Sequence, residues 1–77
     1  MELNDFIAKF SAQFYDTDPA AFKPDTVFKE LEEWSSLSVI TVIEMVDSEY
    51  GIIIDGNVIN KAETIQDLFN EVASRKK

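Results

Sequence analysis

The sequence predicts an all-α fold, a small four-helix bundle with a long first loop and a short third helix. Near both ends of the chain, apolar residues recur every three or four positions, which is the spacing of one face of a helix. A central apolar segment begins after a pair of serines and ends before a glycine, and these are common start and stop residues of helices. With 77 residues, the chain has room for a single domain, residues 1–77.

The composition narrows the chemistry that we expect. The chain has no cysteine and no histidine, so we expect no disulfide, no metal site and no histidine-based triad. Its net charge of −8 disfavours nucleic acids and anionic membranes and favours a basic protein partner. No apolar run reaches the roughly 18 residues of a membrane span, and the first residues lack a signal-peptide pattern. We therefore expect a cytoplasmic monomer without membrane insertion.

The first helix is predicted over residues 2–15. Its apolar face consists of residues at helical spacing: Leu3, Phe6, Ile7, Phe10 and Phe14. Two acids, Glu2 and Asp5, lie in the first turn, where the helix dipole favours negative charge. An aromatic binding stripe is the alternative interpretation of the phenylalanines, but a core face is much commoner.

Residues 16–34 hold both prolines and several turn-forming residues, which predicts a long connecting loop. A loop of this length in a compact domain is usually functional or is held down by its own side chains. We expect four apolar residues to hold it: Phe22, Val27, Phe28 and Leu31. A short helical turn is expected near residues 27–31.

Residues 36–50 carry conflicting signals. The β-branched run 39–43 favours a strand by local propensity. The serine pair before the segment, Gly51 after it and a length well beyond that of a typical strand favour a helix. An apolar set also keeps helical spacing, namely Leu37, Ile40, Ile43, Val46 or Asp47, and Tyr50. We interpret the segment as a helix, with a strand as the alternative.

The last third of the chain contains one ambiguous and one clear segment. Residues 52–60 fit a hairpin, because Asp55-Gly56 between apolar runs is a strong turn signal, and they also fit a short helix near 56–61. Residues 64–75 predict a helix that begins with a capping box formed by Thr64 and Asp67. The predicted core of the whole domain is Phe6, Phe10, Phe14, Phe28, Leu31, Ile40, Ile43, Val46, Ile54, Ile65, Leu68 and Val72.

The order of these segments resembles the acyl carrier protein family of type II fatty-acid and polyketide systems, over nearly the whole chain. The family's hallmark is Asp-Ser-Leu at the start of its second helix, where the serine carries 4′-phosphopantetheine. The matching triplet here is Ser35, Ser36 and Leu37. Ile54 matches an apolar position of the family's second loop, and residues 64–66, Thr-Ile-Gln, match the usual start of its last helix.

The resemblance implies that Ser36 carries covalent 4′-phosphopantetheine and that the chain is no enzyme. Such a carrier holds acyl intermediates as thioesters and delivers them to enzymes of fatty-acid, polyketide or related biosynthesis. Its partners would be a phosphopantetheinyl transferase and acyl-transferring or elongating enzymes, which dock on the second helix. The residues expected to contact partners are Trp34, Val39, Glu44 and Asp47, with Val39 and Val42 forming an apolar patch beside the arm.

The chain also departs from the family pattern. Ser35 stands where the family has aspartate, and Glu33 stands where it usually has glycine. Ser38 and Thr41 are neutral where many members carry acids. These departures indicate a specialised carrier with a dedicated partner. Within the carrier interpretation, attachment of the arm to Ser35 is an alternative to Ser36. The alternative from another class is a small acidic helical adaptor without a prosthetic group, whose serines only cap the helix.

Overall fold

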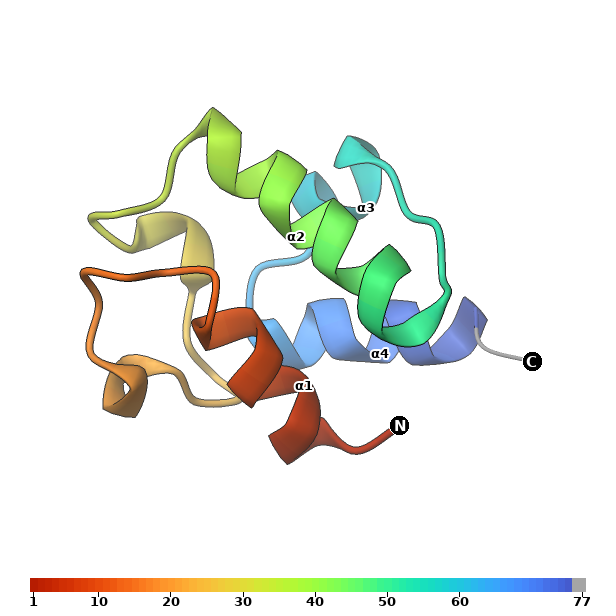
Figure 1. Ribbon diagram of the computed structural model, residues 1–77, viewed down its shortest axis with the longest axis horizontal. Helices are drawn as coiled ribbons and strands as arrows, with labels where there is room; N and C mark the ends of the chain where they lie inside the picture. The colour runs from red at the N-terminus through yellow and green to blue at the C-terminus, as the bar shows by residue number, and fades with distance from the viewer. Residues whose placement is uncertain (76–77) are drawn as a thin grey trace.

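The structure is a computed structural model that describes residues 1–75, and these residues form helices and no β-strand. The four α-helices are α1 (Leu3–Ser11), α2 (Ser36–Tyr50), α3 (Gly56–Lys61) and α4 (Ile65–Arg75) (Figure 1). Two 3₁₀ turns, η1 (Pro19–Ala21) and η2 (Phe28–Glu30), interrupt the long connection between α1 and α2. The predicted all-α fold with a short third helix is therefore confirmed.

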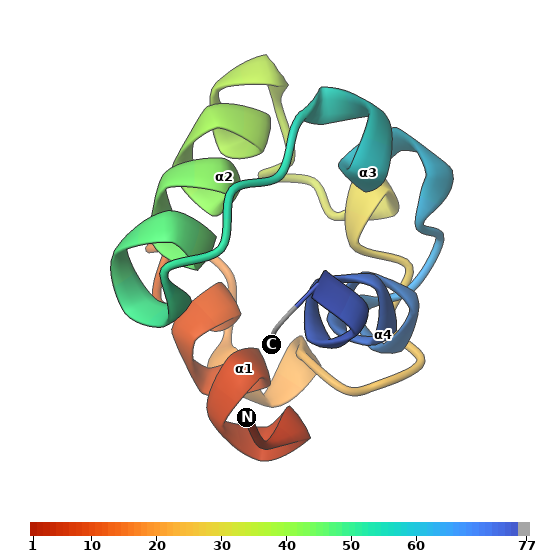
Figure 2. The ribbon, with the colours of Figure 1, turned by 90° about the vertical axis from the view of Figure 1, so that its right-hand side faces the viewer.

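The four helices surround one apolar core. α1 contacts α2 and α4, and α3 contacts the same two helices from the other side. Figure 2 shows this arrangement nearly end-on to α4, with α1 and α2 on one side of the core and α3 and α4 on the other. The long connection covers the end of the bundle at which α2 begins (Figure 1).

α1 is shorter than the predicted helix 2–15, because it ends at Ser11. The chain continues in a tighter turn, in which Gln13 N–H donates to Phe10 O (3.1 Å) and Phe14 N–H donates to Ser11 O (3.0 Å). Hydrogen bonds of this i→i+3 type commonly close a helix. Phe14 stays buried after this turn, with its ring 5.5 Å from those of both Phe10 and Phe22. Phe14 was correctly predicted to lie in the core, but it was expected to lie within the first helix and instead follows it.

α2 is a helix, not a strand, but it buries a different face from the one predicted. Its buried residues are Ser38, Val42, Met45 and Val46, which lie at helical spacing. Ile40, a predicted core residue, is 53% exposed, and Ile43 is half-buried. Val42, expected to be partly exposed, is fully buried. Because this helix is apolar on most sides, residue spacing alone does not determine which face turns inward.

The rest of the core agrees largely with the prediction. Nine of its twelve predicted members are buried: Phe6, Phe10, Phe14, Phe28, Val46, Ile54, Ile65, Leu68 and Val72. Leu31 is half-buried and packs against the core from its edge. Seven further buried residues complete the core: Phe22, Val42, Met45, Ile52, Val58, Ile59 and Ala62.

Side chains and backbone bonds hold the long connection to the bundle. Phe22 and Phe28 are buried as predicted, whereas Val27 is 39% exposed and does not hold the loop. The backbone of the connection also bonds to the start of α4, where Ile65 N–H donates to Thr26 O (3.1 Å). The η2 turn matches the helical turn expected near residues 27–31. The loop is long, but it is not loose.

Local caps explain where the last two helices begin. The Asp55 carboxylate accepts from the N–H groups of Asn57 (3.0 Å) and Val58 (3.2 Å), so Asp55-Gly56 starts α3 and no hairpin forms. At α4, Asp67 N–H donates to Thr64 Oγ1 (3.1 Å), and Thr64 N–H donates to the Asp67 carboxylate (3.1 Å). The predicted capping box is thus present. Hydrogen bonds from the backbone of Thr64 and Glu63 lower the pKa of Asp67.

Candidate functional site

The two serines at the start of α2 have different structural roles. Ser35 precedes the helix with an extended backbone, and Ser36 is the first helical residue. Ser35 N–H donates to Ser38 Oγ (3.1 Å), and Ser38 N–H donates back to Ser35 O (3.0 Å). This pair of bonds fixes the first turn. Ser35 is therefore the N-cap residue through its backbone, and the Ser36 hydroxyl takes no part in these two bonds.

Ser36 presents a free, exposed hydroxyl. Its side chain is exposed, and the structure gives the hydroxyl no hydrogen-bond partner among residues 1–75. The N–H groups of Ser36 and Leu37 lie in the first turn, where helical geometry provides no acceptor. Such N–H groups and the positive end of the helix dipole favour a nearby anion such as a phosphodiester. The site fits a phosphate-linked group on Ser36.

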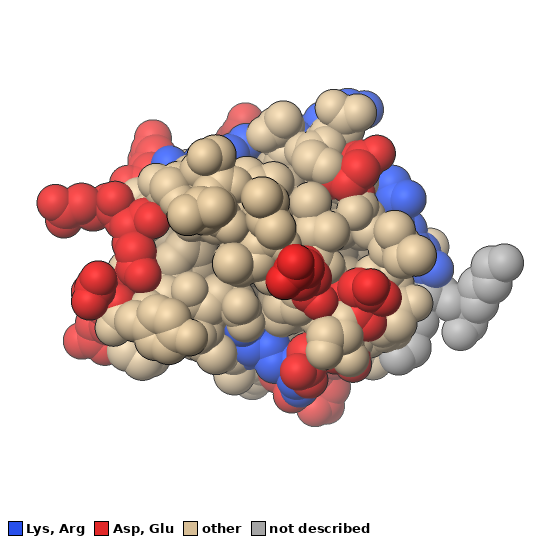
Figure 3. All heavy atoms as spheres, turned by 45° about the horizontal axis from the view of Figure 1, so that its top comes forward, with Lys and Arg blue, Asp and Glu red and all other residues tan. Residues whose placement is uncertain are grey.

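The surface next to Ser36 is apolar, but its members differ from those predicted. Leu37 is 70% exposed and Ile40 is 53% exposed, so these two large side chains face solvent one turn apart. Val39 is half-buried, and the buried Val42 does not contribute. Figure 3 shows that much of this face of the molecule carries no charge.

The predicted acidic contacts lie further along α2. Glu44 and Asp47 are both exposed, in the second half of the helix. Residues 36–43, which form the first two turns, contain no charged side chain. Ser36 and the acids of α2 therefore share a helix without being adjacent.

Trp34 links the site to the core. Its ring is half-buried, stacks on Phe14 with a centroid distance of 6.0 Å, and meets the ring of Phe28 edge-on at 5.0 Å. It was predicted to contact partners, and only part of its surface is left for that. Its packing fixes the backbone directly before Ser35.

The side chain of Glu33 accepts three hydrogen bonds close to the site. Its carboxylate accepts hydrogen bonds from Tyr15 N–H (3.0 Å), Asp16 N–H (3.1 Å) and Thr17 Oγ1 (2.7 Å). The sequence analysis noted Glu33 only as a departure from a family glycine. This difference could have indicated the contact, because a glutamate at this position provides a hydrogen-bond acceptor that a glycine side chain lacks.

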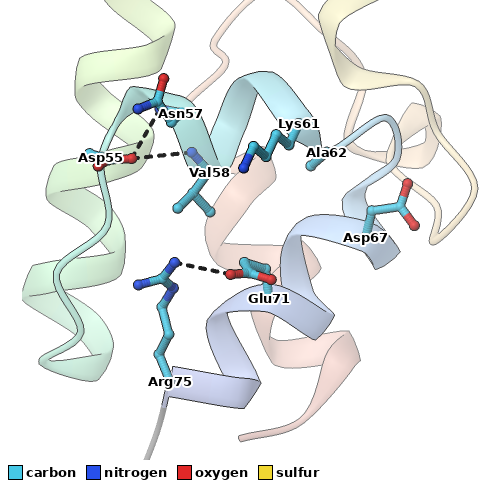
Figure 4. A pocket seen from close by; sticks show the side chains of 8 residues that line it. All are labelled: Asp55, Asn57, Val58, Lys61, Ala62, Asp67, Glu71 and Arg75. Carbon is cyan, nitrogen blue, oxygen red and sulfur yellow. Dashed lines mark hydrogen bonds and ion pairs between the residues drawn. The ribbon is translucent and has the colours of Figure 1, made fainter.

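A separate hollow of about 450 Å³ lies between α3 and α4, away from Ser36 (Figure 4). Its polar side chains largely serve local structure: Asp55 caps α3, and Glu71 forms an ion pair with Arg75 (3.0 Å). Lys61 also reaches into this hollow (Figure 4). In residues 1–75, no cluster of acids is arranged as a metal site. The hollow has no evident connection to the serine.

Comparison with protein-family models, with curated proteins and with solved structures gives no match to this chain. None of the helices described is long and apolar enough to cross a membrane. The function must therefore be inferred from the residues of the site. These combine an exposed hydroxyl, a fixed helix start and two exposed apolar neighbours.

Proposed function

We propose that the protein is an acyl carrier that bears 4′-phosphopantetheine on Ser36. The arm would hold acyl intermediates as thioesters, and the protein would deliver them to enzymes of fatty-acid, polyketide or related biosynthesis. The observation that carries this proposal is the geometry at the start of α2, where the backbone of Ser35 and the side chain of Ser38 fix the first turn and Ser36, the first helical residue, keeps an exposed hydroxyl.

The resemblance to acyl carrier proteins adds to this observation. The serine that matches the family's attachment site is the exposed Ser36, and the helix order agrees with that of the family over residues 1–75. The phosphodiester would lie beside the N–H groups of the first turn of α2, which stabilise negative charge. When bound, the arm supplies a terminal thiol that carries acyl groups.

The attachment itself would be carried out by a transferase that uses coenzyme A. The Ser36 oxygen forms a bond to the phosphorus that bears pantetheine, the P–O bond to the next phosphate breaks, and 3′,5′-ADP leaves. The hydroxyl proton passes to a base on the transferase, since the Ser36 hydroxyl has no basic partner among residues 1–75. A serine without its own base is suited to be modified and not to catalyse.

The proposal is tested by intact mass after incubation with coenzyme A, Mg²⁺ and a broad-specificity phosphopantetheinyl transferase. The chain should gain one phosphopantetheine, and Ser36→Ala should gain none. Ser35→Ala is the matched control, because it removes the neighbouring hydroxyl and should only slow the reaction. If Ser35→Ala lost the modification and Ser36→Ala kept it, the arm would be attached to Ser35, and our assignment to Ser36 would be wrong.

A second candidate is an adaptor without a prosthetic group. The exposed Leu37 and Ile40, followed by the acids of the second half of α2, would suit a partner surface with apolar and basic parts. The same mass measurement separates the two candidates. A chain that stays unmodified with several transferases, while binding its partner, would favour the adaptor.

A further inference from the structure

The turn after α1 is joined to the residue three positions before Ser36. Both carboxylate oxygens of Glu33 are used: Oε2 accepts from Tyr15 N–H, and Oε1 accepts from Asp16 N–H and Thr17 Oγ1, at 2.7 to 3.1 Å. Hydrogen bonds to a charged acceptor are among the stronger ones in proteins. We call the contact of Glu33 with residues 15–17 the loop clasp.

The stacking of Trp34 on Phe14 adds one residue to each of the two segments that meet in the loop clasp. Phe14 directly precedes the clasped turn, Trp34 directly follows Glu33, and their two rings stack with an interplanar angle of 24°. Two consecutive residues before α2 thus contact four consecutive residues after α1. The next residue, Ser35, is fixed through its N–H bond to Ser38. An unbroken series of contacts leads from the loop clasp to Ser36.

The charges around the loop clasp oppose it. The two ends of the long connection, the turn after α1 and the segment before α2, form two loops that lie beside each other. A cleft of about 470 Å³ between them is lined by Asp16, Thr17, Asp18, Glu32 and Glu33. Acidic groups gather at this end of the molecule, at the left of Figure 3. Four acids in one cleft repel one another, which would push the two loops apart. The three hydrogen bonds of Glu33 hold the loops together against that repulsion.

We propose that Glu33 is a positioning residue for Ser36. It fixes the direction from which the chain enters α2, and thereby the orientation in which the Ser36 hydroxyl meets a modifying enzyme. This inference rests on the proposed function. A nucleophile must be aligned with the bond it breaks, and a misplacement of about 1 Å can cost roughly 100-fold in rate. A looser helix start should therefore slow the chemical step, while the docking surface of α2 stays intact.

The test compares Glu33→Ala with Glu32→Ala in the full chain. Both variants remove one negative charge from the same cleft, but Glu32 is exposed and makes no hydrogen bond among residues 1–75. With the unmodified protein as varied substrate of the transferase, Glu33→Ala should lower kcat roughly 3- to 10-fold with little change in KM. Glu32→Ala should leave both constants within about twofold. Glu33→Gln, which keeps one oxygen acceptor, should lie between wild type and Glu33→Ala.

Amide hydrogen exchange provides a second readout that does not depend on modification. Exchange at residues 34–38 should become faster in Glu33→Ala but not in Glu32→Ala, and exchange in α4 should stay unchanged in both. Equal kcat values for the two alanine variants, or unchanged exchange at residues 34–38, would overturn the role of Glu33. A wild-type chain that takes up no phosphopantetheine would instead overturn the proposed function, and with it the role of Glu33 in modification.

Discussion

The two halves of α2 are held to the protein in different ways. The second half is tied to α1, because the Tyr50 hydroxyl donates to the Asp5 carboxylate (2.9 Å) and Lys9 lies 3.9 Å from Glu49. The first half has no charged side chain, and its start is held by the loop clasp and by the Ser35–Ser38 bonds. Charge interactions stabilise one end of the helix, and loop contacts stabilise the other.

The two halves also differ in what they leave exposed. The second half buries Met45 and Val46 and exposes acids, whereas the first half exposes Leu37 and Ile40 beside Ser36. Both halves contribute to the core, since Val42 of the first half is buried like Met45 and Val46 of the second, but the exposed side chains of the first half can be altered with little loss of stability. Within one helix, the exposed apolar side chains beside Ser36 and the exposed acids are separated along the axis, while buried residues occur in both halves.

The largest expected effect is a difference in the free energy of unfolding between a variant at a buried residue and one at an exposed residue of α2. Met45→Ala, in the second half, should lower the free energy of unfolding by roughly 2–5 kcal/mol. Leu37→Ala, in the first half, should change it by no more than about 0.5 kcal/mol, since Leu37 is 70% exposed. Urea denaturation monitored by circular dichroism measures both. Similar losses for the two variants would contradict the exposure of Leu37 beside Ser36.

A smaller effect is expected from adding charge to the first half. Ile40→Glu with Thr41→Glu would extend the acids of α2 towards Ser36, on side chains that are exposed or half-buried. Ser38 is unsuitable for this purpose, because it is buried and accepts the Ser35 N–H bond. With exposed ion pairs worth roughly 0–1 kcal/mol each, turnover by a generic fatty-acid elongating enzyme should rise roughly three- to tenfold.

The charged variant is compared with the unaltered sequence and with a housekeeping carrier at low and high salt. The gain should shrink as salt rises, because screening weakens the added ion pairs. Better turnover of the unaltered sequence would show that the neutral first half does not limit recognition.

A third effect concerns acid and the tie between α1 and α2. Hydrogen bonds from Lys9 and Tyr50 lower the pKa of Asp5, so its contribution to stability is present above the unfolded pKa and is lost as pH falls through the lower folded pKa. Melting temperature should therefore decrease below about pH 4. Asp5→Asn should make this decrease shallower. Asp25→Asn, which neutralises an exposed acid without a hydrogen bond in the described residues, should not, and an equal change in both variants would argue against the tie.

The smallest effect applies to the whole molecule. Fifteen acids against seven bases repel one another, and this repulsion lowers stability at low ionic strength. Raising salt to about 0.15 M shortens the Debye length to about 8 Å and should raise the melting temperature. Millimolar Mg²⁺ should act in the same direction through diffuse binding. A melting temperature that stays constant or falls would refute the repulsion.

The buried face of a helix could be predicted where apolar and polar residues lie on opposite sides. For α2, the helix itself was predicted but its buried face was not. In α4, the apolar residues Ile65, Leu68, Phe69 and Val72 lie on one side of the helix, so the sequence allows a single buried face. In α2, apolar side chains occur on most sides, and the inward face depends on how α1, α3 and the long connection pack around it. That packing is tertiary information, and it selected Val42 over Ile40.

The ends of α2, where the candidate site lies, were predictable from the sequence, but the contacts around its start were not. The serine pair and Gly51 indicated where α2 begins and ends, and both ends agree with the structure. The role of Glu33 depends on its meeting residues 15–17, which are 16 to 18 positions away in the sequence. The early end of α1 has a similar cause, because Phe14 leaves the helix to pack against Phe22 and Trp34. Long-range contacts of this kind leave no periodic pattern.

Trp34 gives the protein a fluorescent reporter of its own. It is the single tryptophan of the chain, and its indole lies against Phe14 and Phe28, two positions before Ser36. Indole emission responds to the polarity and mobility of its surroundings. Its wavelength and anisotropy therefore report on the start of α2 specifically, and no extrinsic dye has to be placed on the surface that a partner would use.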